Sequence, residues 1–329
     1  MSEPHGYQVL EPIACTAGAQ VYRTRPVGGG ATVLIKKAES SAQLRNEFRL
    51  LRSLTLPGVV KAIELLDEHN QPTLVLEDFA GESFETALAR QPRIDWPTGL
   101  AIARNVARVL AGLHSKHLIH LDVRPANLLL EQRTAQVCFI DCSAARSTHL
   151  KVPASEILQG VVDWAYISPE QTGRTGHAVD HRSDLYSLGV MLYRMLTGRL
   201  PFQANDPVEW VHYHLARTPP LAHTIAADIP EVVSEILMRL LAKTPQDRYQ
   251  SGRGLVADID HCLAQWNSRG HLEPFTLGER DFSAELQIPH KLYGRAAETE
   301  RLLETFERMA ATSRPELICV SGYSGIGKS

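Results

Sequence analysis

Two polar side chains with complementary chemistry stand five positions apart near the middle of the chain. The segment from His120 to Asn127 reads HLDVRPAN and lies between an apolar pair and an apolar run. The carboxylate of Asp122 is a group that can accept a proton. The amide oxygen of Asn127 is a group that can bind a hard metal ion. Their spacing makes them candidates for acid–base and metal-assisted chemistry.

The segment resembles the catalytic loop of protein kinases, H-R-D-x-x-x-x-N, except that Leu121 replaces the arginine. The resemblance implies that Asp122 accepts the proton of the substrate hydroxyl group and that Asn127 holds Mg²⁺ on the phosphates of ATP. Asp141 follows the apolar stretch VCFI, as the Asp of D-F-G does, although Cys and Ser replace Phe and Gly after it. Asp141 would bridge Mg²⁺ to the β- and γ-phosphates.

The stretch Val33–Lys36, VLIK, resembles the V-A-I-K strand of kinases, which implies that Lys36 pairs with the α- and β-phosphates. Glu47 lies on the next predicted helix and could reach back to Lys36. Taken alone, a strand lysine and a helix carboxylate are usually solvated surface residues. The interval from Lys36 to Glu47 is short for the family, but the ordered kinase motifs that follow favour the catalytic interpretation.

The glycine-rich loop of kinases, G-x-G-x-x-G-x-V, aligns with a stretch in which all three glycines are replaced. A loop without these glycines is stiffer, so we expect its N–H groups to approach phosphate less closely. Besides Lys36, the nucleotide-binding candidates lie in this stretch and near the end of a strand predicted at 73–77. They are Ala14, Thr16, Gly18, Ala19, Val21, Glu77 and Phe79.

Further resemblances concern residues that support the loop. Glu170 ends the sequence Ser-Pro-Glu, which matches A-P-E, and Arg248 is its expected buried ion-pair partner. Asp184 matches the helix residue that holds the catalytic loop in kinases. Arg124 takes the place of the lysine typical of serine/threonine kinases and keeps its positive charge. Because Asp163 aligns with the threonine that usually binds this lysine, we expect an Arg124–Asp163 pair.

Leu121 replaces the arginine that clamps a phosphorylated activation loop. Ser147, Thr148 and Ser155 are candidate phosphorylation sites, but the usual charge-pair partner of their phosphate is absent. The sequence therefore predicts kinase activity that does not depend on phosphorylation of this loop.

Three phrases narrow the resemblance: YISPEQTGR at 166–174, DHRSDLYSLG at 180–189 and KLYGR at 291–295. They resemble bacterial multidomain signalling proteins, in which a serine/threonine-kinase-like domain precedes an AAA- or STAND-type ATPase, often with GAF and sensor histidine kinase modules. The resemblance implies a protein substrate, and as partners the ATPase and possibly histidine kinase domains of the same full-length protein.

The last residues fit a second nucleotide-binding motif, G-x-x-x-x-G-K-[ST], directly after an apolar strand predicted at 316–320. We expect residues 291–329 to be the truncated start of a P-loop ATPase domain, preceded by a linker at 266–290. The motif residues are Gly322, Gly327, Lys328 and Ser329.

The pattern of elements predicts an α+β fold, the bilobal protein-kinase fold, with ATP in the cleft between the lobes. A β-rich small lobe occupies about 1–80 and a helical large lobe about 81–265. Strands are predicted at 7–13, 20–25, 32–37, 59–66 and 73–77, and helices at 42–54, 98–115, 183–196, 230–241 and 295–310.

Composition limits the alternatives. The chain has 329 residues, 44% of them hydrophobic, and a formal net charge of −3, so nothing suggests nucleic acid as a partner. Its five cysteines are scattered without a C-x-x-C pair, which indicates neither a disulfide framework nor a zinc site. No signal peptide or membrane span is predicted, so we expect a cytoplasmic protein.

Two functions remain open. The first is an active serine/threonine kinase that uses MgATP, favoured because Lys36, Glu47, Asp122, Asn127 and Asp141 are all present. The second is a nucleotide-binding pseudokinase that regulates or scaffolds the downstream ATPase, suggested by the degenerate glycine loop and the altered D-F-G. A small-molecule kinase is disfavoured, because Glu170 and Arg248 are typical of kinases that act on proteins.

Overall fold

The structure, a computed structural model, describes residues 6–15, 18–68, 71–148 and 163–282, together with the single residues 305, 308 and 309. The chain divides into two compact units, Met1–Phe282 and Ser283–Ser329, and the architecture below belongs to the first. The predicted strand at 316–320 lies outside the described residues, and so do the motif residues Gly322, Gly327, Lys328 and Ser329.

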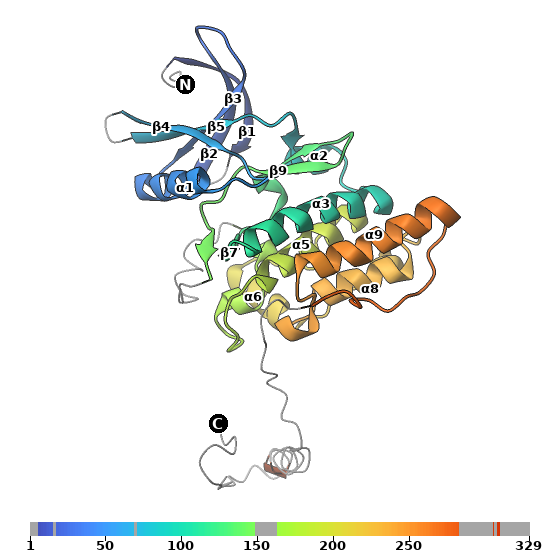
Figure 1. The fold of residues 1–329 in the computed structure, drawn as a ribbon. Helices are drawn as coiled ribbons and strands as arrows, with labels where there is room; N and C mark the ends of the chain where they lie inside the picture. Colours follow the sequence, from blue (N-terminus) through green and yellow to red (C-terminus); the bar gives the residue numbers. More distant parts are fainter. Residues whose placement is uncertain are drawn as a thin grey trace. The chain divides into compact units, whose positions relative to one another are not determined.

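The N-terminal region is a five-stranded antiparallel sheet with one helix beside it, drawn in blue in Figure 1. The strand order is β1-β2-β3-β5-β4, and the strands agree with those predicted from the sequence. The bounds are β1 Tyr7–Cys15, β2 Ala19–Pro26, β3 Val33–Ala38, α1 Ser41–Ser53, β4 Ala62–Glu68 and β5 Gln71–Glu77.

Two periodicities bring charged residues of this region together. Alternation along β3 places Leu34 and Lys36 on one face of the sheet, and both are buried. Helix α1 begins after Ser40, whose Oγ accepts a hydrogen bond from the Gln43 N–H. Its buried stripe includes Glu47 among leucines. A carboxylate on a buried stripe needs a partner, and the lysine of β3 supplies it.

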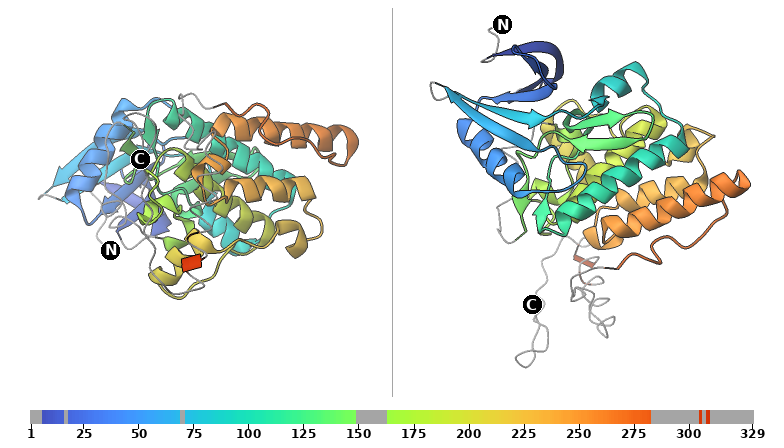
Figure 2. Two further views of the ribbon diagram at one scale, coloured as in Figure 1. Left: turned by 90° about the horizontal axis from the view of Figure 1, so that it is seen from below. Right: turned by 45° about the horizontal axis from the view of Figure 1, so that its top comes forward.

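The rest of the unit is mainly helical, with α3, α5, α8 and α9 packed together (Figures 1 and 2). The helices are α2 Phe84–Arg90, α3 Trp96–His114, α5 Arg182–Thr197, α6 Pro207–Ala216, α7 Ala222–Ile225, α8 Glu231–Leu240 and α9 Gly252–Arg269. Short 3₁₀ turns are η1 Pro125–Asn127, η2 Trp164–Tyr166, η3 Glu170–Thr172 and η4 Pro245–Asp247.

Two small sheets lie next to the helices. One has the order β6-β8-β9 and the other pairs β10 with β7. Val59 lies between α1 and β4. It forms a parallel bridge with Phe139 of β9. The bounds are β6 Glu82–Ser83, β7 Leu118–Ile119, β8 Leu128–Glu131, β9 Gln136–Phe139 and β10 Arg146–Ser147.

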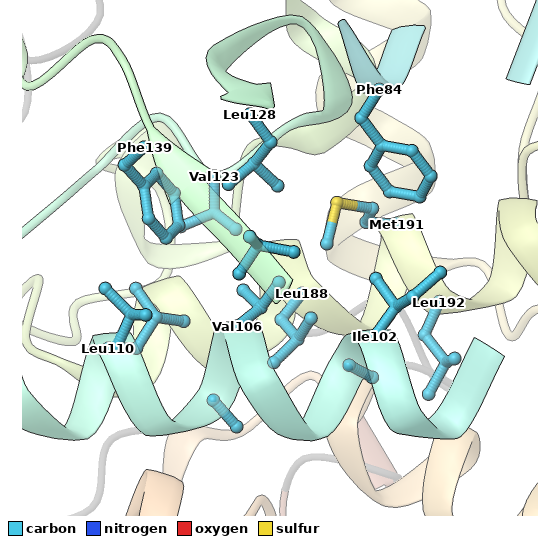
Figure 3. Close-up of a cluster of buried hydrophobic side chains, with 14 of the residues drawn as sticks. Phe84, Ile102, Val106, Leu110, Val123, Leu128, Phe139, Leu188, Met191 and Leu192 are labelled. Atoms are coloured by element: carbon cyan, nitrogen blue, oxygen red, sulfur yellow. The ribbon is translucent and has the colours of Figure 1, made fainter. Parts of the chain in front are cut away.

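The apolar residues of the catalytic-loop segment pack on the core of the large lobe. Figure 3 shows side chains of α3 meeting side chains of α5, with Val123 and Leu128 above them. Val123 and Leu128 are fully buried; Val123 directly follows Asp122 and Leu128 directly follows Asn127. The labelled members of this cluster are Phe84, Ile102, Val106, Leu110, Val123, Leu128, Phe139, Leu188, Met191 and Leu192.

A β-sheet region followed by a helical region agrees with the predicted bilobal α+β architecture. Helix α9 crosses the predicted boundary at 265 and continues to Arg269, and the first compact unit continues to Phe282. Gly278 and Asp281, which follow α9, form hydrogen bonds to the helical core. The chain is therefore not a free linker between Arg269 and Asp281. None of the helices in the described part of the chain is long and apolar enough to cross a membrane.

Candidate active site

Lys36, Glu47 and Asp141 form one buried charge cluster. The Lys36 Nζ lies 2.9 and 2.7 Å from the two carboxylate oxygens of Glu47 and 2.8 Å from Asp141 Oδ1. Lys36 comes from β3, Glu47 from α1, and Asp141 follows β9 by two residues. The backbone N–H of Cys142 also donates to Glu47 Oε1, at 2.9 Å. The predicted lysine–carboxylate pair is therefore formed, and it includes the D-F-G-like segment.

The three groups carry unequal charge. Burial by itself would raise the pKa of Asp141, but the Lys36 ammonium and the N–H of Ser143 hold it well below its usual range. Burial also opposes the charge on Lys36, but its two carboxylate partners raise its pKa above the usual value. Burial raises the pKa of Glu47 to about 7 against the attraction of Lys36. Both carboxylates therefore share the Lys36 ammonium, and Asp141 is the more readily ionised of the two.

The peptide before Asp122 is held in an unusual conformation. Leu121 has φ +66°, a left-handed conformation that costs a non-glycine residue about 1–3 kcal/mol. The buried carboxylate of Asp184 accepts hydrogen bonds from the N–H groups of His120 and Leu121, at 2.9 and 2.8 Å. On the other side, Gln171 Nε2 donates to the Leu121 carbonyl oxygen at 3.1 Å. Asp184 thus lies against the backbone of the catalytic-loop segment, where the sequence predicted it.

Asp122 is oriented by two neighbours on the loop. Asn127 Nδ2 donates to the Asp122 carbonyl oxygen at 2.8 Å and to its Oδ2 at 2.7 Å. The Nε of Arg124 lies 2.9 Å from Asp122 Oδ1, but its N–H is not directed at that oxygen. Burial raises the pKa of Asp122, and Arg124 and Asn127 lower it only in part. The Asp122 side chain keeps 22% of its surface exposed, so a substrate could reach it.

The donor set suits a magnesium ion. Because Asn127 uses its amide nitrogen on Asp122, its Oδ1 is left as a free acceptor, and no partner of this atom occurs among the described residues. Asp141 uses Oδ1 for Lys36 and Ser143, so its Oδ2 is similarly available. Hard oxygen ligands of this kind hold Mg²⁺ when substrate phosphates complete the coordination. In the described ranges no cluster of three or more His, Cys, Asp or Glu forms a separate metal site.

The predicted support from Glu170 and Arg248 is present. Arg248 Nη1 and Nη2 lie 2.7 and 2.8 Å from the two Glu170 oxygens, and both side chains are fully buried. Ser183 Oγ adds a hydrogen bond to Glu170 Oε1 at 2.6 Å. Gln171, the next residue, makes the bond to Leu121 described above. Sequence reasoning missed Gln171, since nothing in its residue type indicates which backbone it binds.

The expected Arg124–Asp163 pair is absent from the described contacts. Arg124 lies on Asp122 instead, and the Asp163 carboxylate accepts the N–H of Ala165, at 3.1 Å, at the start of η2. Asp163 is the N-cap of that turn, a local role that competes with a distant partner.

The nucleotide-binding candidates lie around the small-lobe sheet. Ala14 of β1 pairs with Val21 of β2, and Val21 pairs with Lys36 of β3. Val21 is buried, and no atom comes within 4 Å of the position that a Cβ would take at Gly18. Ala19 begins β2, Glu77 ends β5 and Phe79 follows it, whereas Thr16 lies outside the described residues.

Residues 13–259 match the protein kinase domain family. Serine/threonine-protein kinase pkn2 of Myxococcus xanthus is 32% identical over 76% of this chain and 31% of that protein. Serine/threonine-protein kinase PrkC of Bacillus subtilis is 27% identical over 77% of this chain and 40% of that protein. Hybrid signal transduction histidine kinase G of Dictyostelium discoideum is 41% identical over 50% of this chain, which is 5% of that protein. The chain spans less than half the length of each of these relatives. With serine/threonine kinases among its relatives and the kinase domain matched over most of its length, the chain belongs to the protein kinase family.

Proposed function

We propose that this chain is an active serine/threonine kinase that transfers the γ-phosphoryl group of ATP to a hydroxyl group of a protein. The observation that carries the proposal is the simultaneous placement of both halves of the site. Lys36 is paired with Glu47 and Asp141, while Asp122 is oriented by Asn127. Phosphoryl transfer depends mainly on such positioning and on electrostatic stabilisation.

Each residue has a distinct task in this reaction. Lys36 would bind the α- and β-phosphates, and Glu47 holds its ammonium in place. Asn127 and Asp141 would hold Mg²⁺, which neutralises phosphate charge when bound. Asp122 accepts the proton of the attacking hydroxyl group, for which its raised pKa is favourable.

The altered residues bear on regulation. Leu121 carries no charge to receive a phosphorylated activation loop, and its backbone is fixed by Asp184 and Gln171 instead. The backbone geometry of the catalytic loop then has support that is independent of loop phosphate. We therefore propose a constitutively ordered catalytic loop.

A pseudokinase remains the second candidate, because Cys142 replaces the aromatic residue of D-F-G and Arg124 rests on the proposed base. The match to part of a hybrid histidine kinase favours a place in a larger signalling protein. We propose that this chain is the kinase module of such a protein and that residues 291–329 begin its ATPase domain.

The test is transfer of labelled phosphate from ATP to a generic protein substrate by wild type, Asp122→Ala and Lys36→Met. Asp228→Asn is the matched control, since this carboxylate is 54% exposed and lies on the surface. We expect transfer by wild type and the control, and loss of about 10³-fold in the two site variants. Equal transfer by Asp122→Ala and wild type would show that Asp122 is not the base.

Nucleotide binding separates the two candidates. MgATP at a hundred times its Kd should stabilise the folded protein by about 2.7 kcal/mol. Stabilisation without any transfer would favour the pseudokinase. Absence of both would contradict both candidates.

A further inference from the structure

A strap of residues 270–282 follows α9 and packs back on the kinase unit, beyond the last residue of the family match at 259. Figure 1 shows it in orange, running past α8. Its apolar residues Leu272, Phe275 and Leu277 pack against the hydrophobic core. The strap is therefore part of the folded unit, although the family match does not include it.

The middle of the strap is fixed by hydrogen bonds to buried groups. The Gly278 N–H donates to Asp258 Oδ2 at 2.7 Å, an oxygen that also accepts from the Tyr249 hydroxyl at 2.7 Å. Arg239 Nη1 donates to the Leu277 carbonyl oxygen at 2.5 Å. Gly278 has φ +76°, and a Cβ there would lie 2.4 Å from the Arg239 guanidinium. Glycine adopts this left-handed conformation without steric cost and leaves room for the guanidinium.

At the end of the strap, the carboxylate of Asp281 lies against the start of α9. The Asp281 side chain is 1% exposed. Its Oδ2 accepts the Gln250 N–H at 2.6 Å, and its Oδ1 accepts the Ser251 hydroxyl at 2.9 Å. A Cβ at Gly254 would lie 2.1 Å from Asp281 Oδ1, so the sequence of α9 leaves room for this carboxylate. A buried carboxylate with this many donors is a built contact rather than a surface coincidence.

A continuous set of contacts leads from Asp281 towards the activation segment. Gln250, whose N–H binds Asp281, accepts through Oε1 from Arg182 Nη1 at 2.8 Å. The Arg182 carbonyl oxygen accepts from Arg248 Nη1 at 3.2 Å, and Arg248 binds Glu170 with both nitrogens. Every link joins buried or half-buried groups, so water screens them little.

The last step reaches the catalytic loop. Gln171 follows Glu170 directly and donates to the Leu121 carbonyl oxygen, next to Asp122. The left-handed Leu121 peptide is the strained element on this route, and strain of this kind persists only while its surroundings enforce it.

We propose that Asp281 is a positioning residue for the catalytic loop, acting through Gln250, Arg248 and Gln171 on the Leu121 peptide. Removing its carboxylate leaves the Gln250 N–H without its buried acceptor, and a shift of Gln250 loosens Arg182 and the Glu170–Arg248 pair. The Leu121 peptide then relaxes towards an unstrained conformation, which moves Asp122 relative to the substrate. The test below measures this coupling directly at the Leu121 backbone.

The test compares Asp281→Ala with Glu273→Ala in the full chain. Glu273 lies on the same strap in an ion pair with Arg269, and both of those side chains are more than half exposed. We expect amide hydrogen exchange at Leu121 to become about tenfold faster in Asp281→Ala and to stay unchanged in Glu273→Ala. Unchanged exchange at Leu121 in Asp281→Ala would overturn the proposal.

The kinetic measurement rests on the proposed kinase activity. We expect kcat of Asp281→Ala to fall about fivefold, measured well below its melting temperature, with the KM for ATP unchanged. A lower melting temperature with normal kcat would mean that the strap is structural only, and would overturn the proposal. If wild type shows no Asp122-dependent transfer, the proposed function fails, and exchange at Leu121 still decides the role of Asp281.

A second variant checks the contact without removing the carboxylate. Replacing a helix glycine with alanine normally stabilises the helix. Gly254→Ala should instead displace Asp281, and we expect faster exchange at Leu121 in this variant too. A more stable protein with unchanged exchange would contradict the proposed contact.

Discussion

The guanidinium of Arg124 lies against the carboxylate of Asp122, with 2.9 Å between Nε and Oδ1. The Nε–H is buried, and no hydrogen-bond acceptor for it lies within the described residues. The contact is therefore a charge pair without a directed hydrogen bond. Such a pair holds the base ionised, and it leaves the guanidinium able to turn to a phosphate group, which it can bind with two parallel hydrogen bonds.

We expect Arg124→Met to lower kcat/KM by about 10²-fold, as does loss of other groups that stabilise transition-state charge. Arg124→Lys keeps the charge and should lose much less. Burial raises the pKa of Asp122 and Arg124 lowers it, so removing Arg124 should raise this pKa further. The acidic limb of the kcat/KM profile should therefore move to higher pH in Arg124→Met. A limb that stays in place would contradict the pairing.

Activity should not depend on phosphorylation of the activation loop. Leu121 offers no positive charge, and the loop backbone is fixed by Asp184 and Gln171. Treatment with a phosphatase should therefore leave the transfer rate unchanged, provided mass spectrometry confirms that phosphate has been removed. A large loss after treatment would show that another cationic group reads the loop phosphate.

The sequence allowed prediction of the charged residues of the site because their partners follow from regular structure. Alternation on β3 and the stripe of α1 direct Lys36 and Glu47 to the same side, and Asp141 follows a strand that ends beside them. The ordered motifs assign these residues without knowledge of the contacts.

Other features depend on packing that no motif encodes. Arg124 was expected on Asp163, but Asp163 caps a local turn and a long side chain can choose among several partners. The left-handed conformation of Leu121 and its bond from Gln171 follow from tertiary contacts. The mixed composition of residues 270–282 predicted a linker and gave no sign that the Asp281 side chain is buried.

Removing one partner of the Glu170–Arg248 pair should destabilise the protein more than removing the second partner afterwards. Both side chains are fully buried and bidentately paired. Removing one partner leaves a buried charge, so Glu170→Ala and Arg248→Ala should each lower the free energy of unfolding by about 3–5 kcal/mol. The double variant Glu170→Ala with Arg248→Ala should lose less than the sum of the single losses, because neither charge is then left buried without its partner. Urea unfolding of the four proteins measures this, and strict additivity would contradict a coupled pair.

Acid should destabilise the protein through His214 of α6. Its Nε2–H donates to the Trp164 carbonyl oxygen and its Nδ1 lies 2.9 Å from the Tyr186 hydroxyl, which donates to it when the ring is neutral; both contacts are 2.9 Å long. Burial, helped by the Lys243 ammonium, lowers the pKa of His214 to about 3, below its unfolded value of 6.5. Its contribution to stability is therefore complete above pH 6.5 and is lost as the pH falls towards 3, by at most about 1.4 kcal/mol per pH unit. His214→Gln should show a shallower loss of unfolding free energy between about pH 7 and 5 in urea titrations. His212→Gln, on the exposed face of the same helix, is the control, and equal acid sensitivity of both variants and wild type would exclude His214 as the source.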